Sequence, residues 1–321
     1  MTTRLYRDGL LELDAVPAAD ISDHLKDERT VVWIDLVDPD QAVLDLIAEE
    51  LSLHALALED AIMVHERPKV DRYSEHLFVN AVYVRLDQIS GELSTAEVSA
   101  FVTSRALVTV HGRGFPIEDV VRRWDSSVDL TVHGVAFLLH VLLDVVVDSH
   151  FDAVRALDEE MDALEDLLFD EDSRQHLVQR RTFEMRKSVV LLRRVVLPMR
   201  EVVNSLMRRD VEFVPPALVP YYQDVYDHVL RATEWTDSLR DLIATVLDTH
   251  LTIQGNRLNA VMKKVTGWAA IIAVPTAITG FYGQNVPYPG FGQISGFWMS
   301  SAAIVLMSGV LYIVFRHRDW I

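Results

Sequence analysis

Apolar and polar residues alternate in short segments over the first part of the chain. Three apolar runs, residues 30–37, 77–86 and 98–110, are rich in β-branched and aromatic residues, which is typical of strands. After the first run, Asp38 offers a capping side chain and Pro39 a first-turn proline, so a helix is expected to begin there. Strands that alternate with helices predict an α/β domain at the N-terminus.

From residue 131 onward the apolar positions follow a helical period. Residues 131–172 predict one long helix whose second half is very acidic, and residues 174–210 predict a basic helix. We expect the two to pair as an antiparallel hairpin of opposite charge. Exposed ion pairs contribute only about 0.3 kcal/mol each, so apolar stripes must hold this hairpin together.

The third helical segment is much longer. It can begin at Pro220, and it meets no further proline until Pro275. With a rise of 1.5 Å per residue, a helix over residues 220–282 would be about 95 Å long. A helix of that length cannot bury itself, so we expect it to pack against copies of itself.

Charged residues are absent from one long stretch near the C-terminus. Residues 265–315 contain no Asp, Glu, Lys or Arg, whereas the whole chain has 30 Lys plus Arg and 48 Asp plus Glu, a formal net charge of −18. Two apolar runs in this stretch, residues 265–282 and 296–315, are long enough to cross a bilayer. The sequence thus predicts this order of parts: α/β domain 1–130, helical hairpin 131–216, stalk helix 217–264, first span 265–282, outer loop 283–295, second span 296–315 and tail 316–321.

Basic residues flank the two predicted spans. Arg257, Lys263 and Lys264 precede the first span, and Arg316 and Arg318 follow the second. By the positive-inside rule, both termini are expected in the cytoplasm, with a multi-pass hairpin in the cell (inner) membrane.

Composition excludes several classes of function. A strongly acidic cytosolic part argues against nucleic acid as a partner and is compatible with attracting cations. The chain has no cysteine, so it has neither disulfides nor thiolate metal sites. Its start lacks the apolar core of a signal peptide, so the first span is expected to direct insertion. It has no phosphate-binding loop and no nucleophile–base set, so we do not expect an enzyme.

One register of the long helix is small and polar. We call it the seam: Asp248, Thr252, Gly255, Asn259, Met262, Thr266, Ala269, Ala273 and Thr276. A coiled-coil seam would place Leu, Ile or Val here, but the bulky residues lie beside it: Val246, Leu247, Leu251, Leu258, Val261, Val265 and Ile272. Close packing of small residues between membrane helices is one explanation. We favour a water-filled path for a hydrated cation, because polar residues at membrane depth are tolerated where they meet water.

The first predicted span ends at TAITGFYGQN, residues 276–285. Gly280 and Gly283 can end a helix in the left-handed conformation, which would leave carbonyl groups and the negative end of the helix dipole at the mouth. The amide of Asn285 would add oxygens. Magnesium prefers oxygen ligands and gives up its waters reluctantly, so such a mouth suits the hydrated ion.

The stretch Tyr282-Gly283-Gln284-Asn285 resembles the Gly-Met-Asn signature of the CorA family of magnesium transporters. Other parts of the chain are similar to the same family: Leu58-Glu59-Asp60, then His65-Glu66-Arg67-Pro68-Lys69-Val70, and YYQDVYDH at residues 221–228. The resemblance implies an α+β subunit in a funnel-shaped homopentamer, with five long helices lining the pore. It also implies a passive magnesium channel gated by cytosolic magnesium.

Matched motif by motif, the resemblance implies roles for individual residues. Gly283, Gln284 and Asn285 would form the selectivity filter. The pore lining would include the seam together with Val265, with Thr276 and Asn259 as polar rings, Asp248 as an acidic ring, and Met262, Val265 and Ala273 in a hydrophobic gate. A regulatory magnesium would bind between subunits: Asp60 of one subunit and Asp224 of its neighbour, with Asp144 and Glu59 nearby. Bound metal would neutralise facing carboxylates and stabilise the closed ring.

Some residues depart from the family pattern and leave the ion open. Gln284 replaces the methionine of the signature, and the loop after Asn285 has no acidic residue. Zinc, cobalt or nickel therefore remain alternative substrates, and a non-conducting, membrane-tethered cation sensor is the alternative of another class. His140, Asp144 and Asp148 lie four residues apart on one predicted helix face, where they could bind zinc if a neighbour completed the shell.

Overall fold

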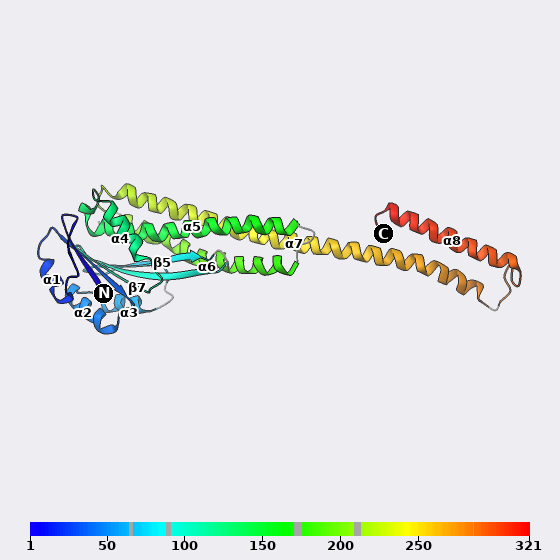
Figure 1. The fold of residues 1–321 in the computed structure, drawn as a ribbon, viewed down its shortest axis with the longest axis horizontal. Helices are drawn as coiled ribbons and strands as arrows, with labels where there is room; N and C mark the ends of the chain where they lie inside the picture. The colour runs from blue at the N-terminus through cyan, green and yellow to red at the C-terminus, as the bar shows by residue number, and fades with distance from the viewer. Residues whose placement is uncertain (64–66, 88–90, 170–174, 209–212, 285) are drawn as a thin grey trace. The chain divides into compact units, whose positions relative to one another are not determined.

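The computed structural model describes residues 1–321 except 64–66, 88–90, 170–174, 209–212 and 285 (Figure 1). The chain divides into two compact units, Met1–Val246 and Leu247–Ile321. The first unit contains a mixed sheet and its covering helices, and the second contains two apolar helices joined by a short loop.

In the described part of the chain, the sheet of the first unit has seven strands in the order β2-β1-β3-β7-β6-β5-β4. Their bounds are β1 Thr2–Arg7, β2 Leu10–Asp14, β3 Thr30–Val37, β4 Lys69–Arg72, β5 Leu77–Leu86, β6 Leu93–Val102 and β7 Ala106–His111. Strands β3 and β7 run parallel, and the other neighbours are antiparallel. This sheet confirms the predicted N-terminal α/β domain.

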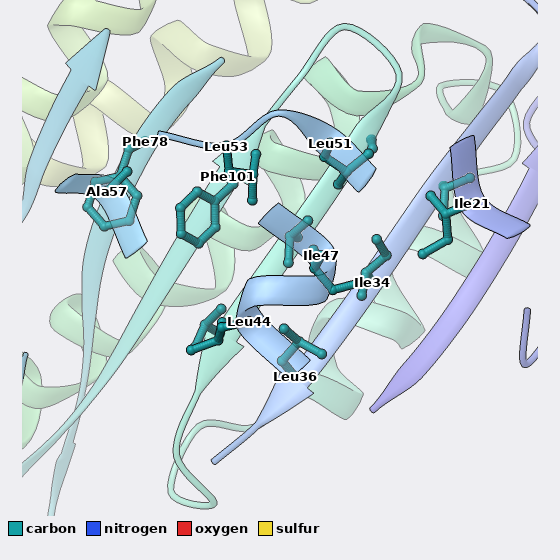
Figure 2. Packing of buried hydrophobic residues seen from close by; sticks show 14 of the residues in the cluster. Ile21, Ile34, Leu36, Leu44, Ile47, Leu51, Leu53, Ala57, Phe78 and Phe101 are labelled. Atoms are coloured by element: carbon teal, nitrogen blue, oxygen red, sulfur yellow. The ribbon is translucent and has the colours of Figure 1, made fainter. Parts of the chain in front are cut away.

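One face of the sheet is covered by short helices: η1 Ala18–Asp20, α1 Ile21–His24, α2 Gln41–Leu51 and α3 Ala55–Ile62. Figure 2 shows Leu44 and Ile47 of α2 packed with Ile34 and Leu36 of β3, and all four are buried. Helix α2 begins later than the sequence predicted. Its cap is Asp40, which accepts a hydrogen bond from the Val43 amide at 2.9 Å, rather than Asp38.

Three more helices of the first unit are α4 Ile117–Ser126, η2 Thr131–His133 and α5 Val135–Phe169. Helix α5 is the long helix predicted over residues 131–172. It docks on β5 through two hydrogen bonds: the Val84 amide donates to Ser149 Oγ at 3.1 Å, and His150 Nε2 lies 2.7 Å from the Val82 carbonyl oxygen.

Helices α6 Gln175–Met207 and α7 Val219–Tyr282 confirm the remaining predictions of long helices. The Tyr222 hydroxyl donates to the Ala136 carbonyl at 2.7 Å, which fixes the start of α7 against α5. The expected apolar stripes are buried: Leu157, Met161 and Leu164 on α5, and Met185, Val189 and Leu192 on α6.

The strand predicted over residues 98–110 was wrong, because it is two strands. Strand β6 ends at Val102 and β7 begins at Ala106. Between them Thr103 Oγ1 accepts hydrogen bonds from the amides of Arg105 and Ala106, at 3.3 and 2.8 Å. A hydroxyl that bonds nearby amides stabilises a turn, which reverses the chain inside an otherwise apolar run.

The second unit holds the end of α7 and helix α8 Ile294–His317. Both helices are long and apolar enough to cross a membrane, and only 6% and 0% of their most apolar windows are buried. A core helix of a soluble protein would be mostly buried. The C-terminal tail returns to α7 inside this unit, since a Cβ atom added to Gly267 would lie 3.1 Å from Ile321 Cγ1.

Candidate pore and regulatory metal site

The seam lies on α7 within the second unit, and its alignment follows from helix geometry. Residues three and four apart lie on one face of a helix, and α7 is continuous through this stretch. The candidate pore-lining side chains are exposed in the single chain: Asp248, Thr252, Asn259, Met262, Val265, Thr266, Ala269, Ala273 and Thr276. The structure therefore places these residues on an accessible surface.

Bulky apolar side chains beside the seam are also exposed. The exposed fractions are 65% for Leu251, 67% for Leu258, 57% for Val261 and 64% for Ile272. Exposed apolar surface of this extent marks contact with lipid or with another protein surface. The two sides of the seam thus need cover from outside the chain, whereas the seam has the polarity to face water.

The seam hydroxyls are oriented by the helix backbone. Thr252 Oγ1 donates to the Asp248 carbonyl at 3.0 Å, and Thr276 Oγ1 donates to the Ile272 carbonyl at 3.1 Å. Each hydroxyl proton is used inside the helix, so the oxygen lone pairs remain available as acceptors. Acceptors are what the hydrogen atoms of a hydrated cation require.

The end of α7 departs from one expectation. Neither Gly280 nor Gly283 has the positive φ of a left-handed cap. The Gly283 amide instead donates to the Thr279 carbonyl at 2.8 Å, which continues the helical hydrogen-bond pattern. The Tyr288 hydroxyl donates to the Tyr282 carbonyl at 2.8 Å, so a side chain of the loop between α7 and α8 satisfies a helix-end carbonyl.

Aromatic rings surround this helix end. Tyr288 contacts Phe281, Tyr282 and Phe291, with ring centroids 6.3, 5.0 and 5.2 Å apart. No pattern in the sequence indicates this role of Tyr288. Gln284 follows this helix end and is exposed, and Asn285, the predicted filter residue, lies outside the described residues.

The regulatory candidates belong to the first unit. Asp60 is on α3 and half-buried, and its Oδ2 lies 2.8 Å from Lys69 Nζ of β4. Glu59 and Asp224, on α3 and α7, are exposed. Of the motif around Lys69, His65 and Glu66 lie outside the described residues.

Asp144 is on α5 and pairs with an arginine that sequence reasoning missed. Arg123 of α4 bridges two carboxylates one turn apart: Nη1 contacts Asp144 Oδ2, and Nη2 contacts Asp148 Oδ2. Burial opposes the charge of Arg123, but the hydrogen bond to Asp148 and the charge of Asp144 outweigh it and raise the pKa of the guanidinium.

His140 lies beside these carboxylates and is buried. Burial lowers its pKa, although the negative charges of Asp144 and Asp224 act in the opposite direction. The start of α7 lies close to this face of α5, because the His140 ring contacts the rings of Tyr221 and Tyr222, with centroids 5.8 and 5.5 Å apart.

The zinc site considered for His140, Asp144 and Asp148 does not form. Arg123 occupies both carboxylates, and within the described residues no group of three or more His, Cys, Asp or Glu side chains could hold a metal ion. The oxygen chemistry of Asp60, Asp144, Asp224 and Glu59 does suit magnesium. One chain supplies these donors as separate carboxylates rather than as a closed cage.

An α/β domain is followed by two mostly exposed helices that are long and apolar enough to cross a membrane, the 64-residue α7 and then α8, and this combination is that of a membrane protein. The family model described as CorA-like Mg2+ transporter protein matches residues 28–317. The chain therefore belongs to the CorA-like Mg2+ transporter family.

The chain is similar to individual transport proteins over most of its own length and most of theirs. The chain is 28% identical to the cobalt/magnesium transport protein CorA of Thermotoga maritima, over 92% of this chain and 85% of that protein. It is 23% identical to the protein of the same name from Methanocaldococcus jannaschii, over 92% and 93%. The complete structure of the CorA magnesium transporter from Methanocaldococcus jannaschii matches with a TM-score of 0.78 at 21% identity, covering 100% of this chain and 99% of that chain, which shows the fold.

Proposed function

We propose that the chain is the subunit of a homopentameric channel that carries magnesium passively into the cytoplasm. The observation that carries this proposal is the exposed polar seam of α7, flanked by exposed apolar side chains, in a member of a magnesium transporter family. The N- and C-termini would lie in the cytoplasm, and α8 and the outer surface of α7 would contact lipid in the cell membrane.

Self-association explains both surfaces of α7. If copies of α7 surround a central axis, their apolar flanks cover one another while each seam faces the axis. Complete burial of a Leu side chain from water contributes about 2 kcal/mol, so covering two-thirds of Leu251 or Leu258, which precede the first span, contributes roughly 1 kcal/mol per residue and subunit. A ring of subunits multiplies that contribution.

The seam supports passage of a hydrated ion. Asn285 amides would receive the ion at the outer mouth, and the lone pairs of Thr276 and Asn259 would accept hydrogen bonds from its water shell. Met262, Val265 and Ala273 are apolar and would close the path by dewetting. Asp248 would attract the ion at the cytosolic end.

Regulation would use the cytosolic carboxylates. Magnesium held between Asp60 of one subunit and Asp224 of the next, with Asp144 and Glu59 nearby, would neutralise like charges and favour the closed ring. When cytosolic magnesium falls, repulsion between the carboxylates would push the subunits apart and open the pore.

Cobalt is the second candidate substrate, because the relatives from Thermotoga maritima and Methanocaldococcus jannaschii are described as cobalt/magnesium transport proteins. Zinc and nickel are further alternative substrates, to be tested together with cobalt. Uptake in the presence of competing magnesium, cobalt, nickel and zinc ranks the four ions.

The test is magnesium uptake into liposomes that contain the purified protein and a trapped magnesium-sensitive dye. The wild type is expected to conduct, and Asn285→Ala is expected to abolish uptake. Asn256→Ala is the matched control, because Asn256 is exposed on α7 but lies outside the seam. A wild type that binds divalent cations but conducts none would establish the non-conducting sensor instead.

A further inference from the structure

Two carboxylates of the proposed regulatory site are already paired with cations of their own chain. We propose that Lys69 and Arg123 are tethered competitors for Asp60 and Asp144, and that they set the divalent cation concentration at which the regulatory site fills. This inference rests on the proposed function of that site, and it adds the residues that determine its affinity and its preference for divalent ions.

The first contact joins β4 to α3. Lys69 Nζ lies 2.8 Å from Asp60 Oδ2 and 3.7 Å from an oxygen of Asp71. The Lys69 and Asp60 side chains are 27% and 24% exposed, so solvent screens their attraction only in part. An ammonium at this distance occupies one side of the Asp60 carboxylate. A divalent ion that binds the same oxygen must move Lys69 away, because two cations repel at such a separation.

The second contact joins α4 to α5. The guanidinium of Arg123 reaches Asp144 with one nitrogen and Asp148 with the other. A planar fork that spans two carboxylates has directed hydrogen bonds as well as charge attraction, and it is more demanding to displace than a single ammonium. Oδ2 of Asp144 is therefore available to a metal ion only after Arg123 has released it.

A tethered cation discriminates between ions by charge. Lys69 is attached near Asp60, so its effective concentration there is high and does not vary with the composition of the cytosol. A free monovalent ion such as potassium has the same charge as Lys69 but lacks the high effective concentration that the tether provides. A divalent ion offers twice the charge and can displace the ammonium, so the pairing favours divalent over monovalent ions.

The size of the effect follows from the stability of the pairs. A partly exposed ion pair favours contact over separation by a factor of about five. Removal of the competitor should tighten apparent divalent binding by that factor, and removal of a positive charge beside the bound metal should add to it. We expect about fivefold to tenfold for Lys69 and about tenfold for Arg123, whose contact involves two carboxylates.

The experiment measures binding of Mn²⁺, by the electron paramagnetic resonance signal of free Mn²⁺, to the purified full-length protein in detergent. Lys69→Met and Arg123→Met are compared with Lys187→Met and Arg122→Met, which remove exposed cations paired with Glu92 and Asp119. Subtracting the binding of Asp60→Asn isolates the regulatory site. The first two variants are expected to bind five to ten times more tightly, with binding more sensitive to potassium chloride, and the two controls to stay within twofold of wild type.

Wild-type or weaker Mn²⁺ binding by Lys69→Met and Arg123→Met would overturn the inference, as would a tightening of the same size in the controls. Thermal unfolding identifies any variant that fails to fold. Lys69→Gln or Arg123→Gln then replaces the methionine variant that fails to fold, and the same tightening of Mn²⁺ binding is expected. Lys69→Arg keeps the charge and should bind Mn²⁺ as the wild type does. Uptake measured after the same proteins are reconstituted into liposomes separates the two claims. An absence of wild-type uptake contradicts the channel, whereas unchanged Mn²⁺ affinity contradicts only the tethered competitors.

Discussion

The close approach of Gly290 to Gly296 offers a sharp test of how the loop between α7 and α8 holds the end of α7. A Cβ atom added to Gly296 would lie 2.5 Å from the Gly290 carbonyl oxygen, whereas ordinary contact begins at 3.4 Å. Gly296→Ala must therefore move the loop by about 0.9 Å, the difference between these two distances. Forcing one extra methyl group into a packed contact costs about 1–3 kcal/mol. The obstructing atom belongs to the backbone, so no side-chain rotation relieves the clash.

The loop that contains Gly290 also contains Tyr288, whose hydroxyl bonds to the last carbonyl of α7. A shift of this size should misplace the mouth, and errors near 1 Å at a binding site reduce rates by about tenfold to a hundredfold. Magnesium uptake into liposomes is the assay, with Gly309→Ala as the control on the same helix, because nothing lies within 4 Å of a Cβ atom at Gly309. Wild-type uptake by a folded Gly296→Ala would refute the reasoning.

Two further predictions follow from the first unit. Burial of His150 lowers its pKa from 6.5 to about 4. As pH falls, the unfolded chain therefore takes up a proton before the folded chain does. The free energy of unfolding that is present above pH 6.5 falls with pH, by about 2 kcal/mol at pH 5. Thermal unfolding of the full chain in detergent at pH 7.5 and 5 should show this loss of stability. His150→Gln, which keeps a donor for the Val82 carbonyl, should lose less stability between these two pH values by the contribution of His150. An identical pH dependence in both proteins would contradict the assignment. Asp224→Lys should raise the cytosolic magnesium concentration needed to inhibit uptake by about tenfold, because a lysine repels the metal at the subunit boundary. Glu234→Lys, a charge reversal at another exposed position of α7, should not. Unchanged inhibition in Asp224→Lys would remove Asp224 from the site.

The long helices could be predicted from the sequence because periodicity accumulates over many turns. Helices α5, α6, α7 and α8 begin and end within a few residues of their expected positions. Short elements gave weaker signals. The β1–β2 hairpin was missed, although Asp8 and Gly9 both have positive φ, at 50° and 81°, which is what an Asp-Gly hairpin turn requires.

The residues of the candidate site likewise include some that the sequence predicts and some that it does not. The seam was predictable because all of its residues lie on one helix, and helix geometry alone brings them together. The pairing of Arg123 with Asp144 was not, because these residues are 21 positions apart and belong to different helices. The same holds for Tyr288, whose contact with Tyr282 depends on the path of an outer loop rather than on any periodic pattern.

If the seam of α7 faces the path of the ion, cysteines in the seam should react with a water-soluble reagent and cysteines on its flanks should not. The natural chain has no cysteine, so each engineered thiol is the only one present. Thr266→Cys and Asn259→Cys in liposomes are treated with a charged, water-soluble methanethiosulfonate during magnesium uptake, with Leu258→Cys as the flank control. We predict rapid modification and block of uptake at the two seam positions and neither at Leu258. Modification of Leu258→Cys with block, while the seam cysteines stay unreactive, would mean that the seam does not face the ion.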